Sequence, residues 1–185
     1  ASRGDAPTVC RPLSRPDAVP VVAVLPLSGI GEGCDPWLGI GIAEDIVAIL
    51  AAVREPAVIS TNSTRRYVAP VDDIPGLGRT LAADYIVTGN VRTMDSALSV
   101  SVELVEAATC VAIWAHRFVT SVDRLAGTQV EIANRIGTAL VPRIGAAELR
   151  RSLAIGPENL GAYHLMLRAR DMMIRLDGPS IEKAG

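Results

Sequence analysis

The fold is decided by Val21-Val22-Ala23-Val24-Leu25-Pro26-Leu27 and by the segment that follows it, Ser28-Gly29-Ile30-Gly31-Glu32-Gly33-Cys34-Asp35. The first stretch is apolar throughout, which is typical of a central strand with helices on both faces of its sheet. Pro26 is expected to end that strand, because proline cannot donate a backbone hydrogen bond to a neighbouring strand. A strand followed by a glycine-rich turn predicts an α/β fold and places any ligand at this turn.

A helix is predicted from Trp37 to Val53, directly after the glycine-rich turn. Its apolar residues recur at the spacing of one helix face, namely Leu38, Ile42, Ile46, Ile49, Leu50 and Val53. Asp35 is expected to cap this helix, and Pro36 fits its first turn. The positive end of the helix would then lie at the glycine-rich turn, where it favours an anion.

The middle of the chain predicts further strands. We expect a second strand at residues 57–60, a polar loop at 61–66, a short helix at 73–83 and a third strand at 84–92. Residues 98–104 alternate apolar with polar, which is typical of an antiparallel strand with one wet face, and residues 111–119 should pair with it. Together these elements predict a mixed sheet of about five strands, with a parallel part and a carboxyl-terminal antiparallel hairpin, packed by helices.

A helical extension is expected after the hairpin. Ser121 can cap a long helix that Pro142 bends or splits. A separate amphipathic helix follows Gly156-Pro157, and another begins at Ile181, which suggests the first unit of a helical repeat array. The expected organisation is therefore a linker or irregular arm at 1–20 with four prolines, an α/β domain at 21–153 and the start of helical repeats at 157–185.

Composition excludes several classes of partner. The chain has 185 residues, 18 basic and 20 acidic, with a net charge of −2 and no long run of one sign, so we expect no bound nucleic acid. No apolar stretch approaches the roughly 18–20 residues that cross a bilayer, so we expect no membrane span. Cys10, Cys34 and Cys110 have neither metal-ligand nor disulfide spacing. We expect no metal or cofactor, and a cytoplasmic location unless a membrane helix precedes the segment, which would place it in the periplasm.

No catalytic constellation is visible. Glu44 and Asp45 are adjacent, so on a helix they point about 100° apart and cannot share one substrate as an acid and a base. His116 and His164 lie far apart, and neither has a neighbour at metal-ligand spacing. The chain also lacks the Gly-x-Ser-x-Gly pattern of a serine nucleophile. We therefore expect this segment to have no catalytic residues and not to be an enzyme.

The glycine-rich turn and the polar loop are the candidate surface for a ligand or partner. The glycines have the spacing GxGxG, not GxGxxG, and no lysine follows as in a phosphate-binding P-loop. A nucleotide-binding domain that uses Gly29–Gly33 is therefore the alternative function. The candidate residues of this surface are Gly29, Gly31, Gly33, Asp35, Trp37, Ser60, Asn62 and Arg65.

The segments Val22–Leu27 and Trp37–Ile46 resemble the opening of the TolB amino-terminal-like (FlgO-like) domain. Similar segments follow in order: Ser60–Tyr67, Gly78–Arg92, Leu104–Thr109, Ile113–Ala115 and Gln129–Ile132. Residues 159–170 resemble the start of tetratricopeptide repeats. The sequence departs from the family at Ile40, where an acid is usual, and at Cys110, where glycine is usual.

In bacterial proteins this pairing accompanies a class III adenylate or guanylate cyclase domain or a winged-helix DNA-binding domain. The resemblance therefore implies a non-catalytic regulatory module for sensing or protein interaction in signal transduction. Its expected partner is another protein or its own output domain. A homodimer through a helix face or the hairpin edge is a further option, and the identity of any small ligand is open.

Overall fold

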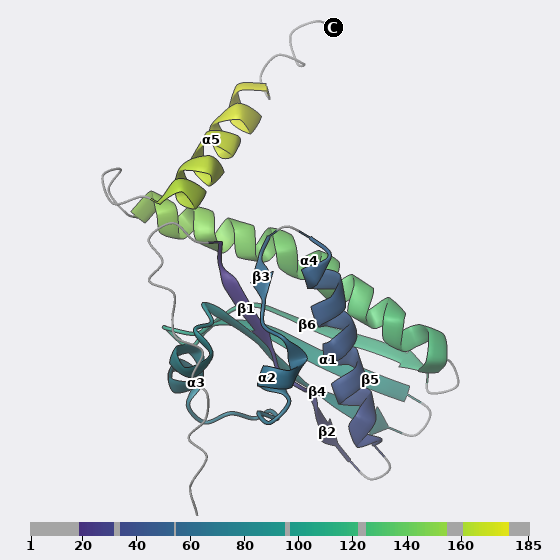
Figure 1. The fold of residues 1–185 in the computed structure, drawn as a ribbon. Helices are drawn as coiled ribbons and strands as arrows, with labels where there is room; N and C mark the ends of the chain where they lie inside the picture. Colours follow the sequence, from purple (N-terminus) through teal and green to yellow (C-terminus); the bar gives the residue numbers. More distant parts are fainter. Residues whose placement is uncertain are drawn as a thin grey trace, which may run out of the picture.

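The computed structural model describes residues 19–31, 34–53, 55–94, 97–121, 125–154 and 161–177 (Figure 1). Its strands are β1 (Val21–Val24), β2 (Ser28–Ile30), β3 (Ala57–Val58), β4 (Tyr85–Met94), β5 (Ala97–Glu106) and β6 (Val111–Ser121). Its helices are α1 (Pro36–Ala51), α2 (Thr61–Thr64), α3 (Ile74–Leu81), α4 (Leu125–Ala154) and α5 (Ala162–Asp177).

The strands form one mixed six-stranded sheet in the order β3-β1-β4-β5-β6, and β2 also pairs with β4. β1 runs parallel to β3 and to β4, and β2 runs parallel to β4. β4, β5 and β6 are successively antiparallel. The predicted fold class is confirmed, and the sixth strand is the three-residue β2, which lies within the segment expected to be a glycine-rich turn.

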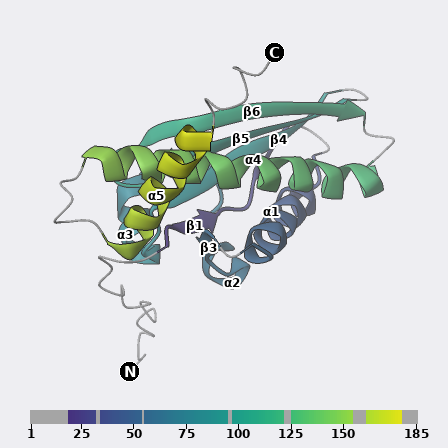
Figure 2. The same ribbon diagram turned by 90° about the horizontal axis from the view of Figure 1, so that it is seen from above.

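The main core lies between the sheet and the helices α1 and α4, which Figure 2 shows on one side of β4, β5 and β6. The alternating residues of β5 are buried on this face, as the sequence pattern predicts. They meet a stripe along α4 made of Ile132, Ile136, Leu140 and Ile144. Each fully buried side chain of this size stabilises the fold by about 1.5–3 kcal/mol.

A smaller apolar cluster lies on the opposite face of the sheet. It contains Ala23 of β1 and Ile86 of β4, which alternate along these strands with residues of the main core, together with Leu25, which follows β1, and Leu77 of α3. The remainder of this face carries polar side chains, of which Thr88 is half-buried. Helices α1 and α4 therefore cover most of one face of the sheet, whereas the other face is covered only in part.

Several local predictions were wrong. The expected polar loop contains the short helix α2, and the expected helix cap Ser121 is the last residue of β6. α4 continues through Pro142 as one helix about 45 Å long, so it is not split there, and the alternative that Pro142 bends it stays a prediction. Most of the expected linker 1–20, and the helix start at Ile181, lie outside the described residues.

Candidate functional site

The glycine-rich segment forms β2 and a bend rather than an open loop. Gly29 lies within β2, and a side chain there would meet Cys34 Sγ at 3.2 Å. Gly31 has φ +105°, a conformation that side chains rarely adopt. Packing and backbone conformation therefore account for both glycines without a ligand. Gly33 lies outside the described residues.

The amino terminus of α1 is occupied by the chain's own carboxylate. Asp35 Oδ1 accepts a hydrogen bond from the backbone N–H of Trp37 at 2.9 Å, as the sequence predicts. One turn later, Leu27 N–H donates to the carbonyl of Gly39 at 3.3 Å, so the helix touches the end of the preceding segment. Because Asp35 supplies a negative charge at the helix end, a phosphate there would meet electrostatic repulsion. This geometry disfavours the nucleotide-binding alternative.

Arg65 is joined to α1 by an ion pair. Its Nη2 lies 2.8 Å from Glu44 Oε1, and the side chains of Arg65 and Glu44 are 59% and 43% exposed. The neighbouring Asp45 accepts a hydrogen bond from Gln129 Nε2 of α4 at 2.8 Å. The adjacent carboxylates thus point toward different elements, as their positions on a helix require.

The other candidate residues surround this corner of the fold. Ser60 Oγ accepts a hydrogen bond from the N–H of Asn62 at 3.4 Å and caps α2, and the side chain of Asn62 is exposed. Trp37 is 74% exposed and stands seven residues before Glu44, about 10 Å along the same side of α1. A broad exposed surface on α1 and α2 therefore includes Trp37, Asn62 and Arg65.

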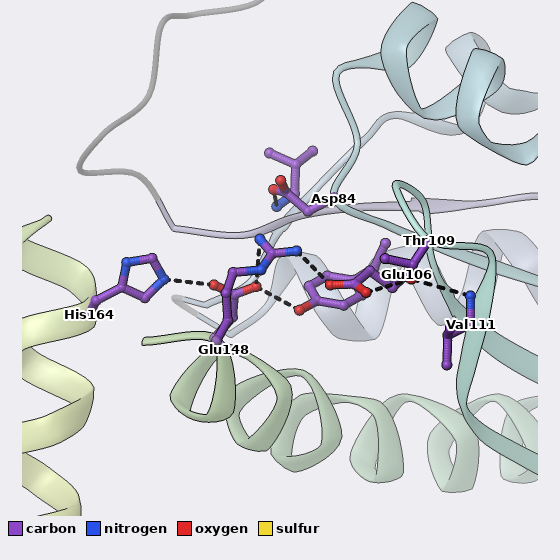
Figure 3. Close-up of polar contacts among 9 residues, drawn as sticks. Asp84, Glu106, Thr109, Val111, Glu148 and His164 are labelled. Atoms are coloured by element: carbon purple, nitrogen blue, oxygen red, sulfur yellow. Dashed lines mark hydrogen bonds and ion pairs between the residues drawn. The ribbon is translucent and has the colours of Figure 1, made fainter. Parts of the chain in front are cut away.

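The most elaborate polar cluster of the described residues was not anticipated from sequence. Tyr85 of β4 is fully buried, and its hydroxyl donates to Glu148 Oε1 of α4 at 2.6 Å. Glu148 is 3% exposed, and its other carboxylate oxygen lies 2.9 Å from His164 Nε2 of α5 (Figure 3). We call Tyr85, Glu148, Arg151, His164 and Glu106 the polar network.

Arg151 supplies the positive charge of the polar network. Its Nη2 donates to Glu106 Oε1 at 2.7 Å, and its Nη1 lies 3.3 Å from Glu148 Oε1. Thr109 completes this end by donating to Glu106 Oε2 at 2.6 Å (Figure 3). A buried carboxylate is costly when it is unpaired, so the contacts with Tyr85, Arg151 and His164 allow Glu148 to lie in the interior.

The polar network also shifts the pKa of its members. Burial, followed by the hydrogen bond to Glu148, raises the pKa of Tyr85 well above its ordinary value. The hydrogen bond from Thr109, followed by that from Arg151, lowers the pKa of Glu106. Burial disfavours the charge on Arg151, but the hydrogen bond to Glu106 and the charge of Glu148 outweigh it and raise its pKa. The ionised forms of Glu106 and Arg151 and the neutral form of Tyr85 are therefore favoured together.

The polar network links β4 and the end of β5 to α4 and α5. A second link is the hydrogen bond from Arg168 Nη2 of α5 to the carbonyl of Ser152 of α4. The sequence did hold a signal for this cluster, because Glu148 and Ser152 continue the four-residue spacing of the buried stripe Ile136, Leu140 and Ile144. A carboxylate in register with such a stripe indicates a buried and partnered charge.

Two further features bear on chemistry. In the part of the chain that the structure describes, no group of three or more histidine, cysteine or acidic side chains is placed to hold a metal ion. Among the described helices, none combines the length and the apolar character that crossing a bilayer requires.

Fold and contacts together define the class of this protein: a mixed α/β domain whose buried charges connect it to a helical extension. The chain belongs to the family described as HilA/YgeH-like transcriptional regulator, second domain, whose model matches residues 18–135.

Other known proteins are similar to this chain. A protein of Rhizobium meliloti (strain 1021) named "Putative adenylate cyclase 3" is 28% identical over 168 residues, which cover 90% of this chain. The chain spans about three-tenths of the length of that relative, since the alignment covers 29% of it.

Among solved structures, TolB from Acinetobacter baumannii has a TM-score of 0.48 at 15% identity, covering 69% of this chain and 29% of that one. The PelC dodecamer from Paraburkholderia phytofirmans has a TM-score of 0.47 at 18% identity, covering 65% of this chain and 88% of that one.

Proposed function

We propose that this chain is a non-catalytic regulatory module of a bacterial signalling protein, either an adenylate cyclase or a transcriptional regulator. It acts by passing a change in contacts from the α/β domain through α4 to α5. The membership of a transcriptional regulator family and the similarity to a protein named as an adenylate cyclase support these two parents. The observation that carries the mechanism is the hydrogen-bonded series Tyr85–Glu148–His164, which joins sheet, long helix and terminal helix.

The polar network is suited to this task because the buried carboxylate of Glu148 depends on each of its hydrogen-bonding partners. Its carboxylate is almost fully buried, so losing the partner on one side raises the cost of its present position. A shift of β4 against α4 that weakens the hydrogen bond from the buried Tyr85 would therefore change the interaction of Glu148 with His164. In such coupling, α5 has two ways of packing against α4, and a contact made at the sheet changes the difference in free energy between them.

The helical extension is the output end in this proposal, and we interpret residues 157–185 as the start of tetratricopeptide-like repeats. An uncovered apolar surface supports that interpretation. The exposed large apolar side chains of α5 include Leu165, Met166, Met172, Met173 and Ile174. In a repeat array the next helix covers such a face, because one unit cannot bury it alone.

The input end is the surface of Trp37, Asn62 and Arg65 on α1 and α2. Its exposure, and its place on α1, a helix that packs against α4 through another side, support this role. We assign the module to the cytoplasm, where free thiols such as those of Cys34 and Cys110 persist.

The experiment compares Glu148→Gln with Glu131→Gln in the full-length protein that carries this domain. Glu131 lies exposed on the same helix, so its change alters charge without touching the polar network. The readout is cyclic nucleotide formation or transcription from a target promoter, together with hydrogen exchange of the α5 amides. We expect Glu148→Gln alone to alter output and to accelerate exchange in α5. Unchanged output in a variant that has lost protection in α5 would refute the proposal.

A further inference from the structure

The outer strand of the sheet borders a groove that the regulatory proposal does not use. The groove has a volume of about 520 Å³ and lies between β6 and α4. Its floor is an aromatic row on alternate residues of β6: Trp114 and His116 stack with ring centroids 6.0 Å apart, and His116 meets the edge of Phe118 at 4.5 Å. Its wall is α4, which contributes Arg135 and Arg143.

The groove is positively charged and apolar at once. Arg135 Cζ lies 5.2 Å from the centre of the Phe118 ring, a cation–π contact that leaves its N–H groups available. Both arginines are exposed, and no carboxylate of the described residues pairs with either of them. Guanidinium groups bind carboxylates with two parallel hydrogen bonds, so the wall is suited to an acidic partner.

The same place offers an unpaired strand edge. β6 has eleven residues and ends the strand order, pairing only with β5 among the described strands. Its outer N–H and C=O groups can therefore receive an additional strand from another chain. A segment added there would project every second side chain to the face that carries Trp114 and Phe118.

The spacing of the arginines along the wall matches the spacing of the aromatic side chains along the floor. Arg135 and Arg143 are eight residues apart, or about 12 Å along α4. Trp114 and Phe118 are four residues apart, or about 13 Å along β6. An extended segment with acidic residues at positions i and i+4 would place one carboxylate near each arginine, and its residue i+2 near His116.

We propose that this groove is a docking site for an extended acidic segment of a partner protein, which adds a strand to β6. The inference rests on the proposed function in one respect, that the module works by being contacted. A second copy of this chain fits less well, because β6 paired with β6 about a two-fold axis would bring a second pair of Arg135 and Arg143 to the same edge.

The probe is the synthetic peptide acetyl-Thr-Glu-Thr-Phe-Thr-Glu-Thr-amide, whose acidic and aromatic residues share one strand face. A control peptide of the same composition, acetyl-Thr-Glu-Thr-Phe-Glu-Thr-Thr-amide, puts the two acidic residues on opposite faces. Binding is followed by the fluorescence of Trp114 in the full chain carrying Trp37→Phe, because the sequence has only two tryptophans.

We expect saturable binding of the probe that weakens at least tenfold in Arg143→Glu and in Arg135→Glu. Arg150→Glu, which reverses an exposed charge elsewhere on α4, is the matched control and should bind as the parent does. The milder Arg143→Gln provides the same comparison if a reversed charge impairs folding. The control peptide, and a probe with alternate backbone nitrogens methylated along the pairing edge, should each bind at least fivefold more weakly.

Four outcomes would overturn the proposal. The first three are the absence of saturable probe binding, an equal weakening of binding by Arg150→Glu, and a self-association in sedimentation equilibrium that Arg143→Glu abolishes without peptide. The fourth is displacement of the probe by a thymidine decanucleotide, which would identify the groove as a single-stranded nucleic acid site, because aromatic and arginine side chains also form such sites. None of these measurements alters the polar network, so their failure leaves the proposed function to its own test.

Discussion

Tyr85→Phe isolates the buried hydrogen bond that joins the sheet to α4. The change removes one hydroxyl and no ring atoms, so the apolar packing of the fully buried ring is kept. Glu148 loses its 2.6 Å bond but retains Arg151 at 3.3 Å and His164 at 2.9 Å. A hydrogen bond to a charged group contributes about 1.5–3 kcal/mol, so we expect the free energy of unfolding to fall by about 2 kcal/mol. At roughly 2–4 °C per kcal/mol for a chain of this size, Tm should fall by about 4–8 °C.

The assay is urea unfolding followed by circular dichroism, with Tyr67→Phe as the matched control. Tyr67 is half-buried, and its hydroxyl makes no hydrogen bond to a described residue, so its loss should cost under about 0.5 kcal/mol. The m-value should be the same for all three proteins, because the surface exposed on unfolding is unchanged. If Tyr85→Phe and Tyr67→Phe proved equally stable, the hydrogen bond to Glu148 would not hold α4 to the sheet.

Three more predictions concern pH, packing and ligands. The raised pKa of Tyr85 means that the unfolded chain releases the Tyr85 proton from about pH 10 upward, while the folded chain keeps it. The free energy of unfolding should therefore fall as pH rises, and Tyr85→Phe should reduce the slope by up to about 1.4 kcal/mol per pH unit. Equal slopes for the two proteins in alkaline unfolding curves would contradict this. Gly39→Ala should lower the free energy of unfolding by about 1–3 kcal/mol, because the added Cβ would lie 2.0 Å from the carbonyl oxygen of Leu27. The control Gly145→Ala, whose added Cβ has no atom within 4 Å, should be neutral or stabilising in thermal melts. Calorimetric titration with ATP, GTP and cyclic AMP is expected to show no saturable heat, and a signal that Gly31→Val abolishes would restore the nucleotide-binding alternative.

The elements with a strong local pattern could be predicted from sequence. The alternation in β5 and the cap and first turn of α1 depend on neighbouring residues, and the structure confirms both. β2 and α2 were missed because Ser-Gly-Ile and Thr-Asn-Ser-Thr are short and have weak propensity for their structures. Their formation depends on pairing with β4 and on capping by Ser60.

The two candidate sites also differ in how far local sequence predicts them. The exposed corner that includes Trp37 and Arg65 follows from local turns and loops, and its role as a contact surface stays a prediction. The polar network could not be assembled from sequence, because Tyr85 and Glu148 are 63 residues apart. Only the pairing of strands and the crossing of α4 bring them together, although the carboxylate on the apolar stripe of α4 indicated that a partner existed.

The length of α4 has a practical consequence for the choice of expression boundaries. The family match ends at residue 135, in the first half of that helix. A fragment truncated there would lack Ile136, Leu140 and Ile144, and would expose the sheet surface that they cover. Such a fragment should be recovered as an aggregate, whereas one extending through Asp177 retains every described partner of Glu148.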